Sequence, residues 1–426
     1  MGNEGSSFQP HAAVSKVEIE ALQKTFPAKP SANLRGKWTE VFEPGQVANI
    51  EKSLKCKAGV ITFQNYQQMF GDVVKGGIDK KVSFMLLLVG ESCQSNIDTD
   101  LLKKCLCAIV SAFLKIHSNC SFRVGDEAEK DKFVSSLLHD LVHPSEKRKT
   151  SYSKEPTNVK VELDEFESVI LNTPVIESIL ADVMRSCFQV TSPSSSLIPT
   201  IPGGTKTKIS LLEAVFLNNS LPHELRPVWR PLFSTDTHGE SFSKLAGAIT
   251  RQGPTLVLVS DEAGNKFGGF ATDPWVMSPK FCGKPETFLY HLNPKMNIYD
   301  STPFNTNYQY FNLKQKTMPN GLGMGGQLEY FGFWIDHEFG IVKTSPSCST
   351  YHSPQLGETE GKIRGLEVFG VGELKIEEDE DGPSVLDMDP EAQAVLEMMG
   401  KTFHSKVIRE VDEEQEKKKE MEKQHE

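Results

Sequence analysis

The sequence predicts an α+β protein in which a helical N-terminal half precedes a β-rich half. Apolar residues recur at spacings of three and four up to about residue 190, the period of an amphipathic helix. From residue 255 onward, short runs of β-branched and aromatic residues alternate with turn residues, which is typical of antiparallel strands. Between them, residues 191–208 are rich in Ser, Pro and Gly and are expected to form a linker.

The first 42 residues are polar and are expected to form an N-terminal arm that contains one short helix, SKVEIEALQKT at 15–25. The chain starts MGNEGSS, which fits the pattern M-G-x-x-x-[ST]. In that pattern the methionine is removed and Gly2 is acylated with myristate, because the transferase needs an α-amine on a residue without a side chain. The alternative is a start of small polar residues that contains the motif by chance.

Residues 43–190 are predicted to form an all-helical domain, with the clearest periodicity in DLLKKCLCAIVSAFLKI and EKDKFVSSLLHDLV. One stretch aligns with an EF-hand calcium loop that ends at Asn65. Gly59 and Ile61 then fall at positions six and eight, as in an EF-hand. The first three ligand positions, however, carry no carboxylate, because they are Leu54, Cys56 and Ala58.

A second such stretch ends in LDEF, with Glu165 at position twelve and no glycine at position six. Its first three ligand positions are Lys154, Pro156 and Asn158. Because calcium requires several oxygen ligands, we interpret both stretches as degenerate EF-hand-like loops without a metal, and a calcium-responsive sensor remains the alternative.

Residues 209–373 are predicted to form two packed antiparallel sheets with helices at their margin. A first helix begins at Ser210, which forms a capping box with Glu213, and a second helix is SFSKLAGAIT at 241–250. The predicted strands are TLVLVSD, KFGGFATD, TFLYHLN, MNIYD, YQYFNL, LEYFGFWID, GIVKT and GLEVFGVG.

An acidic spacer, 374–388, precedes a predicted C-terminal helix at 389–426, which starts at Asp389 and Pro390. Its apolar stripe suits a hydrophobic groove on a partner, and docking on the chain itself is the alternative. The stripe residues proposed to bind a partner are Val395, Met399, Phe403 and Val407.

The composition excludes several classes of partner and site. The formal net charge is -11, so bulk charge favours neither nucleic acid nor anionic headgroups. No run of eighteen apolar residues is present, and a membrane-spanning helix is not expected. The eight cysteines are scattered without a CxxC pair, which favours reduced thiols in the cytosol over disulfides or zinc.

Three motifs suggest chemistry. GLGMGG at 321–326 resembles a phosphate loop, but no helix follows it, so we interpret its glycines as supplying positive φ angles where a loop crosses near the sheet. His337 and Glu338 are interpreted as a turn between strands. Cysteine–histidine pairs, Cys348 with His352 and Cys282 with His291, lack a local catalytic signature. No catalytic residue, cofactor or metal is therefore predicted.

Several blocks of the β-rich half resemble the TLDc domain, the module shared by oxidation-resistance proteins and certain nuclear-receptor coactivators. These blocks are LPHELRPVWRPLF, TLVLVSD, FGGFATDPW, FLYHLNP, NGLGMGGQLEYFGFWID and IRGLEVFGVG. With the MGNEGSS start and the helical half, the whole chain resembles a myristoylated, lysosome-associated member of this family that is linked to mTOR signalling. The resemblance implies a β-sandwich and no enzymatic activity.

The resemblance also implies a peripheral adaptor or regulator in the cytoplasm, on the lysosomal membrane. Its implied partners are subunits of the vacuolar ATPase and proteins of the mTOR pathway. Six aromatic residues are expected in the core: Trp229, Phe233, Phe270, Phe331, Phe333 and Trp334. Trp275 is expected there too, but it follows a turn and is also a candidate interface anchor. A thiol-based antioxidant enzyme is the alternative, and it requires an exposed cysteine of lowered pKa.

Overall fold

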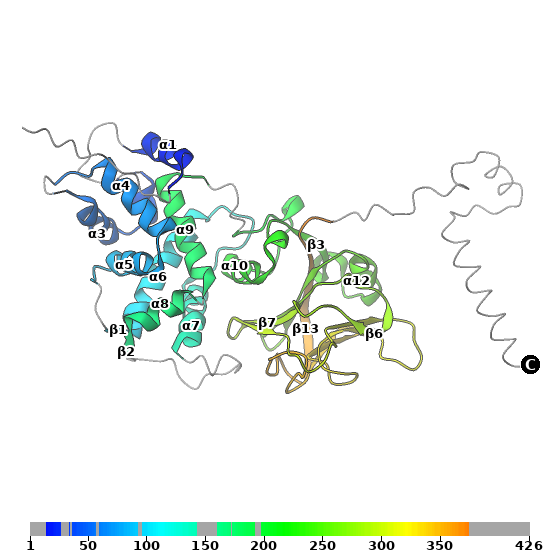
Figure 1. Cartoon of the computed structure of the whole chain (residues 1–426). Helices are drawn as coiled ribbons and strands as arrows, with labels where there is room; N and C mark the ends of the chain where they lie inside the picture. The colour runs from blue at the N-terminus through cyan, green and yellow to red at the C-terminus, as the bar shows by residue number, and fades with distance from the viewer. Residues whose placement is uncertain are drawn as a thin grey trace, which may run out of the picture. The chain divides into compact units, whose positions relative to one another are not determined.

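The structure is a computed structural model that describes residues 14–26, 34, 36–56, 59–92, 96–142, 160–171, 173–191 and 197–374. Its compact unit ends at Leu374. Gly2, the acidic spacer after Leu374 and the four candidate partner-binding residues of the predicted last helix lie outside the described residues. The α+β class is confirmed: helices come first and an antiparallel sheet follows (Figure 1).

The N-terminal half is built from amphipathic helices and one small strand pair. The strands β1 (Asn96–Asp98) and β2 (Lys160–Glu162) pair antiparallel, with Ile97 opposite Val161. The helices are α1 (Lys16–Thr25), α2 (Lys37–Val41), α3 (Pro44–Leu54), α4 (Phe63–Phe70) with a π-helical turn (Gly71–Lys75), α5 (Ile78–Leu88), α6 (Thr99–Ile116), α7 (Glu127–Val142), α8 (Leu163–Leu171) and α9 (Pro174–Phe188).

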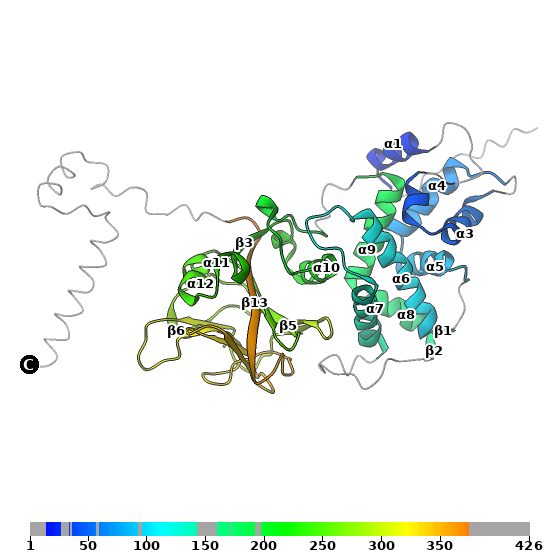
Figure 2. The ribbon, with the colours of Figure 1, turned by 180° about the vertical axis from the view of Figure 1, so that it is seen from behind.

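Helix α6 is the central element of this half, packed against α7 and α9 (Figures 1 and 2). It begins where the Asp98 carboxylate accepts a hydrogen bond from the Leu101 N–H at 2.6 Å, an N-cap that satisfies a free backbone donor. Its buried stripe repeats at helical spacing and consists of Leu102, Leu106, Ile109 and Phe113.

The described part of the predicted arm is packed into this half rather than extended. Helix α1 is the helix expected at 15–25, with Ser15 as its N-cap. Leu22 is fully buried, and the Trp38 ring meets Phe188 edge-on with 5.0 Å between centroids. Glu18 forms ion pairs with Lys75 and Arg185, so apolar burial and charge pairing both attach this segment to α9 and the π-helical turn.

The described part of the predicted linker, residues 197–208, is also packed. Ile201 is buried, and the Thr200 N–H donates to the Pro227 carbonyl at 2.9 Å. The Thr207 hydroxyl donates to the Glu367 carboxylate at 2.8 Å. The Ser, Pro and Gly content of this segment therefore reflects its turns, and its apolar residues attach it to the core.

Residues 229–371 form an eleven-stranded antiparallel sheet that folds into two layers, with order β6-β9-β10-β11-β12-β13-β4-β5-β7-β8 and with β3 against β13. The strands are β3 (Trp229–Ser234), β4 (Thr255–Asp261), β5 (Lys266–Ala271), β6 (Ser278–Cys282), β7 (Phe288–Asn293), β8 (Asn297–Asp300), β9 (Gln309–Asn312), β10 (Gly321–Met324), β11 (Phe333–Asp336), β12 (Ile341–Thr344) and β13 (Glu360–Val371).

Strand β13 connects the two layers. Its first residues pair with β12, and the remainder pairs with β4 and β3. Val257 and Val259 face the second layer across an apolar interior that includes Phe333. Leu256 and Leu258 alternate with them and face the opposite way, into a cluster that also contains α10 (Leu211–Ser220) and extends into the N-terminal helices. The first layer is therefore buried on both faces, which explains why all of β4 is buried.

The position of α10 corrects the expectation that the helices of this half lie only at the margin. The helix covers the outer face of the first layer, and most of its residues are buried. The capping box predicted at Ser210 and Glu213 is confirmed. Trp229 donates its indole N–H to the Asn218 side chain at 3.1 Å, so the helix is also tied to β3 by a buried hydrogen bond. The second predicted helix is α12 (Phe242–Ile249), preceded by a single turn, α11 (Thr235–His238).

Candidate functional site

The GLGMGG segment is partly a strand, which corrects its interpretation as a loop. Gly321 to Met324 form β10, in the middle of the second layer between β9 and β11. Only Gly325 and Gly326 leave the strand, with φ angles of 73° and 79°. No helix N-terminus follows the segment within residues 321–336, so it lacks the geometry that binds phosphate.

The glycines of β10 make room for an aromatic cluster on the outer face of the second layer. A Cβ atom on Gly321 would lie 2.4 Å from the Trp334 ring, and a Cβ on Gly323 would lie 2.8 Å from the Phe331 ring. Phe331 and Trp334 stack with 4.4 Å between centroids and lie beside Tyr310. The cluster is buried, so the glycines serve packing and not a ligand.

The candidate acid–base pair, His337 and Glu338, lies in the predicted turn. Strand β11 ends at Asp336 and β12 begins at Ile341, and Phe339 and Gly340 between them adopt φ angles of 65° and 90°. The His337 ring contacts the neighbouring Asp336 carboxylate at 2.8 Å. His337 and Glu338 are exposed, so this turn provides no enclosed site for a substrate.

The described cysteines with a shifted pKa are less reactive than a free thiol. Burial raises the pKa of both Cys105 and Cys187 to about 12. Burial also raises the pKa of Cys348, and burial together with the Asp273 carboxylate raises that of Cys282. Because the thiolate is the reactive form, these four thiols are poor nucleophiles at neutral pH and do not favour the thiol-enzyme alternative.

His291, one of the two candidate bases, is enclosed in the core. It is 2% exposed, and neither ring nitrogen has a hydrogen-bond partner among the described residues, although the Leu356 backbone lies close by. Burial lowers its pKa to about 4, an effect that the Leu356 backbone and the Asp261 carboxylate oppose only in part. The ring packs edge-on against Phe267, so His291 is a neutral core residue without access to a substrate.

The first candidate calcium loop is closed by hydrogen bonds of its own. Asn65, which aligns with position twelve, donates its side-chain amide to the Leu54 carbonyl at 2.7 Å. Thr62 caps α4, and Lys55 forms an isolated bridge with Ile61. Among the residues that the structure describes, no group of three or more His, Cys, Asp or Glu side chains could hold a metal ion.

Of the second candidate loop, the structure describes only the part from the start of β2 onward. Its Val161, at position eight, pairs with Ile97 of β1, and not with the loop around Ile61. Sequence reasoning missed this partner because β1 is only three residues long and has no calcium-loop signature. The pairing nevertheless places two helix–strand–helix units side by side, α5–β1–α6 and α7–β2–α8.

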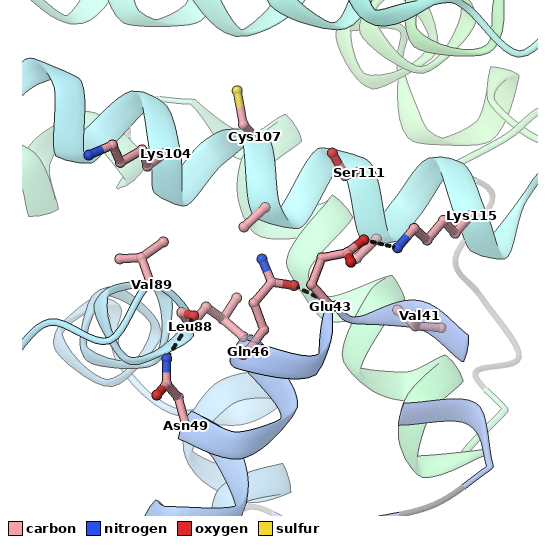
Figure 3. A pocket seen from close by; sticks show the side chains of 13 residues that line it. Val41, Glu43, Gln46, Asn49, Leu88, Val89, Lys104, Cys107, Ser111 and Lys115 are labelled. Atoms are coloured by element: carbon pink, nitrogen blue, oxygen red, sulfur yellow. Dashed lines mark hydrogen bonds and ion pairs between the residues drawn. The ribbon is translucent and has the colours of Figure 1, made fainter. Parts of the chain in front are cut away.

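A groove of about 530 Å³ lies along α6 in the N-terminal half (Figure 3). Small residues of α6 form one side of it, and the start of α3 and the end of α5 form the other. The Lys115 ammonium and the Glu43 carboxylate pair at 2.5 Å at one end, and Lys104 lies at the other. The small residues of α6 that line the groove are Cys107, Ala108, Ser111 and Ala112.

The residues that line this groove suit binding of another molecule better than they suit catalysis. Burial raises the pKa of Cys107, which makes its thiol a weak nucleophile. The side chain of Gln46 is engaged by the backbone N–H of Glu43 at 3.0 Å, and that of Asn49 by the Leu88 carbonyl at 3.3 Å. These polar side chains are therefore already hydrogen-bonded to backbone groups at the start of α3 and the end of α5.

Trp275 is a core residue, which corrects its assignment as an interface anchor. Its side chain is fully buried, and the indole N–H donates to the Thr255 hydroxyl at 2.7 Å. The Arg251 N–H donates to the Trp275 carbonyl, which holds the turn against α12. The expectation of a buried position is confirmed for the aromatic residues Trp229, Phe233, Phe270, Phe331, Phe333 and Trp334.

Comparison with known proteins identifies the β-rich half. Residues 206–372 match the model of the TLDc domain. The chain is 34% identical over 361 residues to a Gallus gallus protein named MTOR-associated protein MEAK7, covering 80% of this chain and 76% of that protein. The chain belongs to the TLDc protein family. This confirms the resemblance seen in the sequence blocks.

Two further relatives show how far the likeness of this TLDc protein extends. A Xenopus laevis protein, also named MTOR-associated protein MEAK7, is 47% identical over 229 residues, and the match spans 52% of this chain and half the length of that relative. Human Nuclear receptor coactivator 7 is 30% identical over 143 residues, or 33% of this chain and 14% of that protein. The first name states an association with mTOR, and the second states coactivation of nuclear receptors. In the described part of the chain, no helix is long and apolar enough to cross a bilayer.

Proposed function

We propose that this TLDc protein is a peripheral adaptor or regulator on the cytosolic face of lysosomes, without enzymatic activity. Its proposed partners are the vacuolar ATPase and proteins of the mTOR pathway, bound through the TLDc domain and the predicted last helix. The observation that carries the proposal is the similarity, over 80% of the chain, to a protein named as mTOR-associated. The raised pKa values of the buried thiols support binding over thiol chemistry.

The proposed membrane attachment is a myristoyl group on Gly2. A single myristoyl chain binds membranes with an association constant of only about 10⁴ M⁻¹, so stable attachment needs a second contact. The first cysteine is Cys56, and the lysines of the first 42 residues are interspersed with glutamates, so neither palmitate nor a basic patch supplies it. We infer that contact with a protein complex is the second attachment.

The lipid is tested by replacing Gly2 with alanine and measuring both the mass of the N-terminal peptide and membrane recovery from fractionated cells. The matched control is Gly5→Ala, which alters a glycine in the same segment without removing the acceptor. We expect a myristoylated N-terminal peptide and membrane recovery for the control, and loss of both for Gly2→Ala. Equal recovery of the two variants would remove the lipid from the proposal.

The partner is tested with the purified vacuolar ATPase and with purified mTOR complex. The full chain is compared with a variant in which the stripe residues of the last helix, Val395, Met399, Phe403 and Val407, are replaced by serine. We expect the full chain to bind and the variant to bind less, because the stripe supplies apolar contact area. If the full chain binds neither complex, the proposed partners are wrong.

We further propose that the helical region is EF-hand-like but does not bind calcium. Support comes from the two helix–strand–helix units and from the bond of Asn65 to the Leu54 carbonyl. Titration of the full chain with calcium in a calorimeter is expected to produce no binding heat. Heat that saturates at micromolar calcium would instead favour the calcium-sensor alternative.

A further inference from the structure

Three loops of the TLDc domain are connected to one another by hydrogen bonds. We call them the loop platform, residues 301–307, 325–330 and 345–353. Thr350 is fully buried at its centre. Its hydroxyl accepts from the Gly326 N–H at 2.8 Å and donates to the Asn305 side-chain oxygen at 2.6 Å. One side chain thus holds all three loops.

Further bonds connect the loops in pairs. The Thr302 hydroxyl donates to the Ser349 carbonyl at 2.5 Å, and the Thr302 N–H donates to the Thr350 carbonyl at 2.7 Å. The Asn307 side-chain amide donates to the Gly326 carbonyl at 2.8 Å. The backbone of the platform is therefore ordered before any partner arrives, which reduces the entropy that binding would cost.

This braced platform exposes large apolar side chains. Phe304 is 79% exposed, Tyr330 is 62% exposed and Leu328 is 36% exposed. Isolated exposed apolar residues are common on soluble proteins, but these three lie on loops that are hydrogen-bonded to one another. Large side chains on a rigid backbone are typical anchors of protein interfaces, because their burial excludes water at little cost in order.

The charges of the platform distinguish between a protein and a lipid surface as the ligand. None of its residues is Lys or Arg, and Glu329 is exposed between Leu328 and Tyr330. Exposed Asp300 precedes the first loop, and the Ser301 hydroxyl donates to the carbonyl of Pro285, whose neighbours Lys284 and Glu286 are both exposed. Glu329, Asp300 and Glu286 therefore outnumber the cation Lys284 at this surface. Anionic headgroups attract cationic side chains, so a negative platform disfavours the cytosolic leaflet and favours a protein surface that carries positive charge.

A second copy of this chain is also disfavoured. A two-fold contact centred on the platform would bring Glu329 of one copy close to Glu329 of the other. Like charges that face each other weaken an interface. The same carboxylate instead complements a lysine or arginine on a different protein.

We propose that Phe304, Leu328 and Tyr330 anchor the docking of a protein partner whose apolar pocket is bordered by Lys or Arg side chains facing Glu329. The inference rests on the proposed adaptor function and assigns it a surface. It also assigns to exposed loop residues the role of anchor that the sequence suggested for the buried Trp275.

The test measures binding of the full chain to the purified vacuolar ATPase by biolayer interferometry. The triple variant Phe304→Ser, Leu328→Ser, Tyr330→Ser removes the anchors. The control variant Val276→Ser, Met277→Ser changes two side chains of the same domain, each 47% exposed, outside the platform. We expect the triple variant to weaken binding about tenfold or more and the control to change it less than about twofold.

The charge is tested separately. Glu329→Lys is expected to weaken binding more than Glu329→Gln, with a difference that shrinks at high salt, because it places like charges opposite each other. Glu338→Lys, on the exposed turn after β11, is the matched control and is expected to bind normally. Thermal unfolding of every variant verifies that it is folded.

Each outcome of these binding experiments tests a different part of the proposal. If the parent chain binds and the triple variant binds equally well, the assigned surface is wrong while the proposed function stands. If the parent chain does not bind, the partner and this inference fall together. Sedimentation of the non-acylated chain with vesicles of phosphatidylcholine and phosphatidylserine, abolished in the triple variant, would identify a lipid-binding platform. Concentration-dependent dimerisation lost in that variant would identify a self-association surface.

Discussion

The helical region and the TLDc domain each contain an ion pair between elements, and the two pairs differ in burial. In the helical region, Lys103 of α6 and Asp131 of α7 pair at 2.8 Å with their side chains 30% and 52% exposed. In the TLDc domain, Glu213 is 1% exposed and pairs with Lys266 at 2.8 Å. Buried charges occur in the helical region as well, where Glu18 pairs with Lys75 and Arg185. The depth of each pair, and not the region that contains it, therefore decides how much stability depends on it.

The largest expected effect comes from breaking the buried pair. Lys266→Met leaves the Glu213 carboxylate in the core without its cation, although Ser210 still donates to it. We expect the free energy of unfolding to fall by about 3–5 kcal/mol. The surface counterpart, Lys103→Met, is expected to cost less than about 1 kcal/mol. Urea unfolding at pH 7 measures both.

A second substitution tests the cause. Adding Glu213→Gln to Lys266→Met removes the buried charge and is expected to recover part of the lost stability. A double variant as unstable as Lys266→Met would show that packing, and not the unpaired charge, produces the loss. If Lys266→Met and Lys103→Met lowered the free energy of unfolding equally, the expected difference between the buried pair and the surface pair would be wrong.

The second effect concerns pH and the buried ring of His291. Because burial lowers its pKa to about 4 in the folded protein, against about 6.5 when unfolded, the folded state accepts only the neutral ring. Its contribution is complete above pH 6.5 and is lost as the pH falls toward 4, where the unfolded chain binds the proton first. We expect a loss of about 2 kcal/mol between pH 7 and pH 5 from this group.

His291→Leu is the variant that isolates this effect. It keeps the site apolar and removes the titrating group, so the stability of the variant is expected to change less than that of the parent chain between pH 7 and pH 5. Urea unfolding at the two pH values measures the difference. In the helical region, burial raises the pKa of Glu18, but hydrogen bonds from Ser15, Lys75 and Arg185 together outweigh that effect and lower the pKa, so acid loss of stability from that group begins only below about pH 4.5. Parallel pH profiles for parent and variant would show that His291 is not the sensitive group.

Sequence patterns predicted the helical elements well because their signals are local. The capping box of Ser210 and Glu213 and the N-cap of α1 at Ser15 each lie within four residues of chain. Strand β4 was also predicted at its observed bounds, since an apolar run ends at a turn signal. In each case the residues that decide the structure are close in sequence.

Strands β3 and β10 escaped prediction for opposite reasons. Pro231 argues against a strand, but β3 pairs only with β13, and an edge strand tolerates the missing donor. Gly321 and Gly323 have low strand propensity, yet their lack of side chains is what lets Trp334 and Phe331 lie over β10. Here the deciding residues are distant in sequence, so propensity alone does not find them.

The loop platform was missed for a related reason. Phe304 and Tyr330 are apolar in sequence like any core residue, and only the three-dimensional structure shows that they are exposed. Trp275 was misassigned in the opposite direction, because a loop position does not reveal burial against Thr255. A chain offers many apolar residues near turns, and exposure depends on which loops meet.

The last expected effect on stability comes from adding one methyl group to a glycine, tested at one glycine in each region. Gly321→Ala places a Cβ atom 2.3 Å from the Ile335 carbonyl oxygen and 2.4 Å from the Trp334 ring, so β10 and the aromatic cluster must separate. We expect a loss of about 1–3 kcal/mol from this overpacking.

The control is Gly45→Ala in α3, whose Cβ atom meets no atom within 4 Å. We expect it to be neutral or stabilising by up to about 1 kcal/mol, because alanine favours the helix. The two variants differ from the parent by the same single methyl group, so urea unfolding of both compares a crowded position with an open one. If Gly321→Ala unfolds at the same urea concentration as the parent, β10 can move away from Trp334 at no cost, and the glycines of GLGMGG are not required for packing.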